Sequence, residues 1–100
     1  DVHFTRLTDS ESVFTPPNNP WVQQVFDICE RLSGTRPKPK CLMYFTDAAA
    51  LHPALGQPPT IILGPGEAGQ AHKTDEYCLV TRIEEAERIY FEICKKWCVK

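Results

Sequence analysis

Two stretches of the chain repeat apolar side chains every three to four residues, a pattern typical of amphipathic helices. The first begins after Asn19, a good helix cap, places Pro20 in the first helical position, and ends at Gly34. The second begins at Thr81 and Glu84, whose T-x-x-E spacing predicts a capping box. The apolar faces consist of Val22, Val25, Phe26, Cys29 and Leu32 in the first helix and of Ile83, Ala86, Ile89, Tyr90, Ile93, Cys94 and Trp97 in the second.

Two uninterrupted apolar runs predict strands that are covered on both faces, "CLMYF" at 41–45 and "TIIL" at 60–63. Residues 46–59 between them are long enough for a crossover with one short helix, which favours parallel pairing. Val2 and Phe4 alternate with polar residues and predict a further strand. We therefore expect an α/β fold with a mixed, largely parallel sheet flanked by helices.

The stretch "FTPPNNP" at 14–20 holds three prolines in seven residues. Proline fixes a backbone angle and removes an amide donor, so this stretch disfavours both a helix and a central strand. It predicts a linker or hinge.

Length and charge limit the classes of function. One hundred residues suit a single domain, and the formal net charge of −2 gives no reason to expect nucleic acid or an anionic membrane as a partner. No apolar run approaches the roughly 20 residues of a membrane helix, so we expect a soluble protein.

The five cysteines cannot all pair internally, because their number is odd. All five lie within apolar patterns, so we interpret them as reduced thiols in the core, and the protein as cytoplasmic. Cys94 and Cys98 stand one helical turn apart, as metal ligands can, but no second pair completes a zinc set, and core packing is favoured.

The candidate chemistry gathers after the two apolar runs. "GPGEAGQAHKTDEY" at 64–77 places His72 near two carboxylates, which suits either a solvated loop or part of a metal site. Asp47 follows the first run, where it could border a ligand crevice or cap the next helix. A basic stretch of three residues could contact an anion, although solvation is the favoured interpretation: Arg36, Lys38 and Lys40.

At these residues the chain resembles the carboxyl-terminal part of the dinuclear zinc aminoacylase and carboxypeptidase family, which includes acetylornithine deacetylase, succinyl-diaminopimelate desuccinylase and glutamate carboxypeptidase. The resemblance rests on "YFTDAAAL", on "PTIILGPGEAGQAHKTDEY" and on the closing amphipathic helix, and it covers about residues 14–98. It implies that residues 1–14 form the terminal strand of a lid or dimerisation domain, 15–19 a hinge, and 20–100 the carboxyl-terminal segment of the catalytic domain.

The resemblance also implies a site. His72 corresponds to the one metal ligand that this segment of the family contributes to a pair of zinc ions, with cobalt as an alternative metal. Thr46 and Asp47 correspond to a pair that faces the active-site cleft as substrate contacts or supports of the metal ligands. Gly64 and Gly66, in the turn before His72, are expected to bind substrate or support the ligands in the same way. The substrate would be a small N-acyl amino acid or a dipeptide, and a homodimer fits the family.

The other zinc ligands and the general-base Glu of this family belong to an amino-terminal part that these 100 residues do not supply. The chain also begins without Met. We therefore expect a fragment of a metal-dependent amide hydrolase that is inactive alone, with the missing amino-terminal part as its partner. The alternative is a stand-alone, non-catalytic α/β domain that uses the His72 loop to contact another protein.

Overall fold

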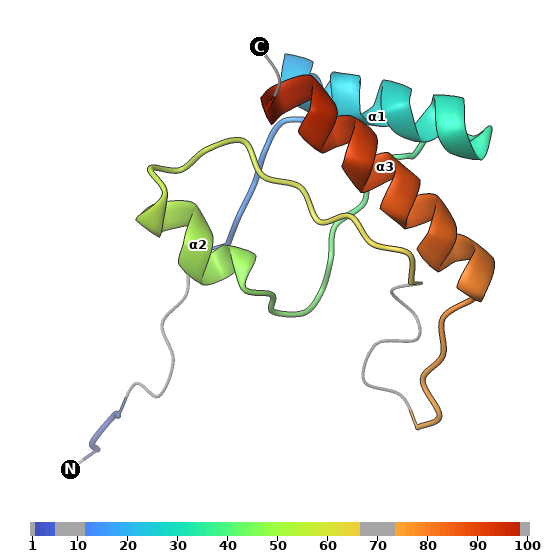
Figure 1. Cartoon of the computed structure of the whole chain (residues 1–100). Coiled ribbons are helices and arrows are strands. Elements are labelled where there is room, and N and C mark those ends of the chain that lie inside the picture. The colour runs from blue at the N-terminus through green and yellow to red at the C-terminus, as the bar shows by residue number, and fades with distance from the viewer. Residues whose placement is uncertain (1, 6–11, 67–73, 99–100) are drawn as a thin grey trace.

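The computed structural model describes residues 2–5, 12–66 and 74–98. Three helices are found in these residues: α1 (Pro20–Ser33), α2 (Ala48–Ala54) and α3 (Val80–Cys98). The remaining described segments are turns and irregular chain (Figure 1). No described residue lies in a strand, so the prediction of a largely parallel sheet is wrong for this part of the chain.

Helix α1 has the ends that its sequence predicts. The Asn19 side-chain oxygen accepts from the backbone amides of Trp21 at 2.9 Å and Val22 at 3.4 Å, and Pro20 occupies the first turn. Gly34 ends the helix in the left-handed region at φ 82°, where its amide donates to the Glu30 carbonyl at 2.8 Å. A residue with a Cβ would be strained in that conformation.

Replacing Asn19 with alanine should lower the free energy of unfolding by about 1 kcal/mol, because the first amides of α1 would lose their acceptor. Chemical denaturation of the chain, followed by the helical circular dichroism signal, measures this change. Asn18→Ala is the matched control, since Asn18 is exposed in the preceding turn and supplies no cap. An equal loss in both variants would contradict the capping role of Asn19.

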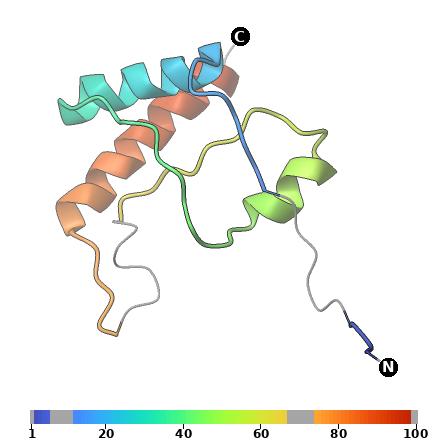
Figure 2. The same ribbon diagram turned by 180° about the vertical axis from the view of Figure 1, so that it is seen from behind.

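The core lies between α1 and α3, which pack against each other in both views (Figures 1 and 2). Its buried centre is small, and partly buried side chains from α1, α3 and the 60–63 segment surround it. Full burial of each such apolar side chain contributes roughly 1.5–3 kcal/mol. The central residues are Val25, Ile28, Cys29 and Ile89, and the surrounding ones are Trp21, Leu32, Ile61, Leu63 and Ile93.

The two apolar runs are not strands, although one of them contributes to the core. Ile61 and Leu63 pack against the helices while Ile62 is half exposed, which is the alternation of a strand with one covered face. In the run at 41–45, Met43 is 93% exposed and Phe45 is 77% exposed. A sheet requires a neighbouring strand to pair with each backbone amide and carbonyl, and the described residues provide none for either run.

The predicted crossover contains one short helix, as expected, because α2 occupies Ala48–Ala54 between the two runs. None of its residues is buried. At the amino-terminal end, Val2 and Phe4 are exposed and lie outside any strand, so that strand prediction is also wrong. Residues 16–19 form a turn in which the Asn19 amide donates to the Pro16 carbonyl at 3.0 Å. The proposed domain boundaries at 14 and 19 stay predictions.

Helix α3 begins at Val80, one residue before the predicted cap, so Thr81 lies inside the first turn. Ala86 and Ile89 are buried as its apolar pattern predicts. Tyr90 and Trp97 also belong to that pattern, but more than two fifths of each side chain is exposed. Helix α1 alone does not cover the whole apolar face of α3.

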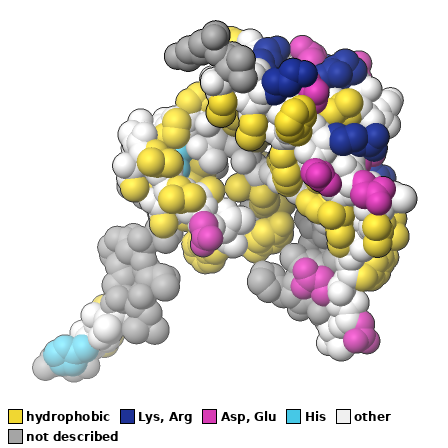
Figure 3. All heavy atoms as spheres, viewed as in Figure 1, with side chains coloured by type: hydrophobic (Ala, Val, Ile, Leu, Met, Phe, Trp, Pro, Cys, Tyr) yellow, Lys and Arg dark blue, Asp and Glu magenta, His cyan; other side chains and the backbone are white. Residues whose placement is uncertain are grey.

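Large hydrophobic side chains remain exposed over much of the surface, as the yellow areas of Figure 3 show. A stable monomeric domain rarely leaves contiguous apolar patches of large size uncovered, so such a surface indicates an interaction site. The most exposed residues outside the amino-terminal segment are Phe14, Met43, Phe45, Leu51, Leu55, Ile62, Tyr77, Leu79, Val80 and Phe91.

Candidate functional site

The segment that carries the candidate chemistry starts at Gly64 and returns to α3 through residues 74–79. His72 itself lies outside the described residues, so its position as a metal ligand stays a prediction. The described residues on either side fix the two ends of this segment.

Gly64 and Gly66, at the start of the segment, do not have a positive φ. Among the described glycines, only Gly34 and Gly56 do. A Cβ added to Gly64 would lie 3.8 Å from the hydroxyl of Tyr90, an ordinary contact, and one added to Gly66 would meet no described atom within 4 Å. Backbone conformation and crowding by the described residues therefore do not require glycine at either position. Their proposed part in substrate binding stays a prediction.

The return from the segment contains a left-handed residue, Asp75 at φ 56°. Aspartate tolerates this conformation better than most residues because its short polar side chain can interact locally with the backbone. Asp75 and Glu76 are both exposed. They are accessible carboxylates on the chain that follows His72 in sequence.

Thr46 and Asp47 stand at the amino-terminal end of α2. The Thr46 hydroxyl accepts from the Ala48 amide at 3.3 Å, and Thr46 is half-buried. Asp47 occupies the N-cap position of α2, but its side chain makes no capping hydrogen bond and is exposed. Asp47 is therefore the N-cap residue of α2, as one of its two interpretations predicted, but its carboxylate makes no hydrogen bond to the helix.

The structure does not bring these candidate residues together. Figures 1 and 2 show α2 on the opposite side of the 60–66 segment from the start of α3, and no backbone hydrogen bond joins Thr46 or Asp47 to Gly64 or Gly66 among the described residues. Within that part of the chain, no group of three or more His, Cys, Asp or Glu side chains could hold a metal ion. The described residues therefore do not form a metal site by themselves.

The 60–63 segment, which leads into Gly64, is anchored by two side-chain hydrogen bonds. The Thr60 amide donates to the hydroxyl oxygen of Thr15 at 2.8 Å, and the Tyr90 hydroxyl donates to the Leu63 carbonyl at 2.7 Å. Sequence analysis assigned Tyr90 only to the apolar face of α3. Nothing in the local pattern indicates its hydrogen bond, because Leu63 lies 27 residues away.

Arg36 is held by three polar side chains of α1. Its guanidinium donates to Asp27 at 2.6 Å and to Glu30 at 3.3 Å, and it also donates to the side-chain oxygen of Gln23. The hydrogen bond to Asp27 is the main cause that raises the pKa of Arg36. These exposed pairs attach the chain after α1 to the surface of that helix.

The cysteines differ from their predicted positions. All five are free, but only Cys29 is buried, so the interpretation of the other four as core thiols is wrong. Burial, and next the nearby charge of Glu85, raise the pKa of the Cys29 thiol. A raised pKa keeps this thiol neutral and unreactive near pH 7. The exposed cysteines are Cys41, Cys78, Cys94 and Cys98.

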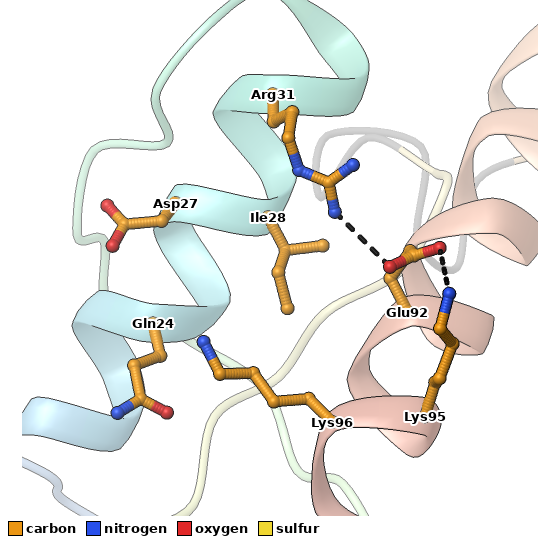
Figure 4. Close-up of a pocket in the computed structure, with 7 residues that line it drawn as sticks. All are labelled: Gln24, Asp27, Ile28, Arg31, Glu92, Lys95 and Lys96. Atoms are coloured by element: carbon orange, nitrogen blue, oxygen red, sulfur yellow. Dashed lines mark hydrogen bonds and ion pairs between the residues drawn. The ribbon is translucent and has the colours of Figure 1, made fainter.

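A groove of about 330 Å³ separates the exposed sides of α1 and α3 (Figure 4). Glu92 lines it and pairs with Arg31 at 3.3 Å and with Lys95 at 3.8 Å. None of the candidate site residues lines this groove. The Arg31–Glu92 pair joins the two helices at the surface, where such a pair contributes no more than about 1 kcal/mol.

Comparison with known proteins finds one matching family and several similar proteins. The model of peptidase family M20/M25/M40 matches residues 1–96. The chain is 30% identical over 81 residues to an acetylornithine deacetylase of Vibrio cholerae, and 30% identical over 83 residues to one of Shigella sonnei. These alignments cover 81% and 83% of this chain and 19% of each relative.

The chain thus spans about a fifth of the length of the curated relatives that it matches. No solved structure matches it. Among the described helices, none is both long enough and apolar enough to cross a lipid bilayer.

Proposed function

Because the chain belongs to peptidase family M20/M25/M40, we propose that it is the carboxyl-terminal segment of a metal-dependent hydrolase that removes the acyl group from an N-acyl amino acid. The observation that carries this proposal is the family match over residues 1–96. The similarity to acetylornithine deacetylases supports a deacylase over other members of the family. A carboxypeptidase acting on a dipeptide is the nearest alternative substrate class.

His72 is proposed as the one metal ligand of this segment. Imidazole is a good ligand for zinc, and along the sequence His72 follows the hydrogen-bonded Leu63 and precedes the turn at Asp75. Since the described residues hold no metal site, the remaining ligands and the general-base Glu are proposed to come from the rest of the protein. Zinc, or cobalt in its place, would supply a Lewis acid and a water of lowered pKa.

Thr46 and Asp47 are proposed as substrate contacts or as supports of the metal ligands. The exposed carboxylate of Asp47, which makes no bond to the helix that it precedes, supports this role. A carboxylate that makes no hydrogen bond to its own helix can accept hydrogen bonds from another group.

The missing amino-terminal part of the same protein is the proposed partner of the exposed apolar surface. Met43, Phe45 and Ile62 have exposed side chains in the two apolar runs, and packing against the rest of the protein would remove this apolar surface from water. Association into a homodimer and location in the cytoplasm are further parts of this proposal.

The test is hydrolysis by the whole protein that contains this chain. With zinc bound, it should hydrolyse N-acetylornithine or another small N-acyl amino acid, and a chelator should abolish this activity. The 100-residue chain alone should show no hydrolysis and only weak zinc binding. Tight stoichiometric zinc binding by the isolated chain would contradict the fragment interpretation. Metal-independent binding of another protein, with no hydrolysis by the whole protein, would favour the non-catalytic interaction domain.

A further inference from the structure

Two exposed thiols lie one turn apart near the carboxyl-terminal end of α3. Cys94 and Cys98 are both free and exposed, and neither belongs to the packed core. They lie at roughly 140° and 180° round the helix from the buried Ile89, so both face away from the contact with α1. Within the described part of the chain, no hydrogen bond engages either sulfur, whereas the exposed thiol of Cys78 donates to the Leu79 carbonyl at 3.8 Å.

The separation of the two thiols suits a shared metal ion better than a disulfide. Cβ atoms four residues apart on a helix lie about 5–6 Å from each other. A disulfide requires Cβ atoms about 3.5–4.5 Å apart, so the intact helix does not allow one between Cys94 and Cys98. Two sulfurs bound to one ion can be up to roughly 4.6 Å apart, which is twice a metal–sulfur bond of about 2.3 Å. Because each sulfur extends beyond its Cβ, both can reach a single ion without a change in the helix.

The number of thiolates selects the class of ion. Among the described residues, no third His, Cys, Asp or Glu side chain completes a group with this pair. A structural zinc ion takes four ligands, so two thiolates do not satisfy it. Soft ions prefer thiolate ligands, and Cu(I) is stable with two of them in a nearly linear arrangement.

Phe91 and Lys95 border the pair on the surface of α3. Phe91 precedes Cys94 by three residues and Cys98 by seven, so its exposed ring lies on the same side of the helix. The Lys95 ammonium lies 5.9 Å from the centre of this ring. A Cu(I) ion with two thiolates carries one net negative charge, and the helix dipole disfavours negative charge at a carboxyl-terminal end. The nearby ammonium group offsets this effect.

We propose that Cys94 and Cys98 form a binding site for one Cu(I) ion. On binding, the two S–H groups release their protons and two Cu–S bonds form, with no change in the oxidation state of copper or sulfur. The site uses none of the residues proposed for hydrolysis and does not depend on the proposed function. Serine at either position removes one thiolate and leaves the contact between α1 and α3 in place.

The experiment measures Cu(I) binding by the whole protein that contains this chain, without oxygen and in competition with bicinchoninate. Cys94→Ser and Cys98→Ser each remove one proposed ligand. Cys41→Ser and Cys78→Ser are the matched controls, because each removes an exposed thiol that has no second cysteine one turn away. Maleimide labelling identifies the accessible thiols of the folded protein, and circular dichroism gives the melting temperature of each variant.

The wild type should bind one more equivalent of Cu(I) than either α3 variant. Each α3 variant should bind this ion about a hundredfold more weakly or worse, because the second thiolate of a pair binds at an effective concentration in the millimolar range. The sulfur-to-copper absorption in the ultraviolet should fall with it, while the melting temperature without copper stays unchanged. Both controls should bind copper as the wild type does.

Four outcomes would overturn the proposal. The first is equal affinity in the wild type and the two α3 variants. The second is an equal loss in Cys41→Ser or Cys78→Ser, which would show non-selective binding to exposed thiols. The third is failure of maleimide to label Cys94 and Cys98, which would show that the rest of the protein covers them. The fourth is one copper per two chains with a dimer in sedimentation, which would place the ion between two copies.

Discussion

Replacing His72 with alanine in the whole protein should lower hydrolysis of N-acyl amino acids roughly a hundredfold or more. Groups that only orient a metal ligand typically affect activity or metal affinity 10–100-fold, and we expect a larger effect from loss of a ligand itself. The fold should remain nearly intact, because the described core is built from residues of α1, α3 and the 60–63 segment. Turnover and bound zinc are measured together on wild type and variant.

His52→Ala is the matched control for this substitution. His52 lies in α2, its carbonyl accepts from the Gln57 amide, and no catalytic role is proposed for its imidazole. The control should retain both zinc and turnover. If His72→Ala also retained both, with a cost of no more than roughly 0.5 kcal/mol in stability, His72 would be a solvated loop residue.

Replacing Ile89 with alanine should destabilise the chain by about 2–5 kcal/mol, the range for removing a buried isoleucine side chain to Cβ. Ile89 is 6% exposed and joins α3 to the buried residues of α1. Since a domain of this size has a total stability of only about 5–15 kcal/mol, the α1 and α3 pair should lose much of its structure near 37 °C. Thermal unfolding followed by circular dichroism measures the change.

Ile83→Ala on the same helix is the control, because Ile83 is 49% exposed in this structure and loses much less contact on truncation. The two variants remove the same atoms and have the same effect on helix propensity. Equal destabilisation would mean that the packing of α3 on α1 is not what holds the chain together.

Features that depend on neighbouring residues were predicted correctly. Asn19, Pro20 and Gly34 determine where α1 begins and ends, because capping bonds and a left-handed glycine act over one helical turn. The short helix between the apolar runs and the burial of Ala86 and Ile89 also follow from local pattern. The candidate residues came from family resemblance, and the family is confirmed.

Features that depend on residues far apart in the sequence were not predicted correctly. A run such as 41–45 is apolar enough for a buried strand, but a strand exists only where another strand pairs with its amides and carbonyls. The described residues supply no such strand, so Met43 and Phe45 are exposed and the sheet is absent. For the same reason Cys41 is exposed instead of lying in a core.

The sequence by itself determined the ends of α1 and the existence of α2 and α3, because each depends on residue type and short spacing. The roles proposed for the candidate residues came from the resemblance to the family. Only the tertiary structure decided that α1 and α3 form the core, that Arg36 is held by carboxylates, and that Tyr90 bonds to Leu63. Those contacts join residues that lie far apart along the chain. Many residues of the same type could make each contact, and the packing of the folded chain decides which of them does.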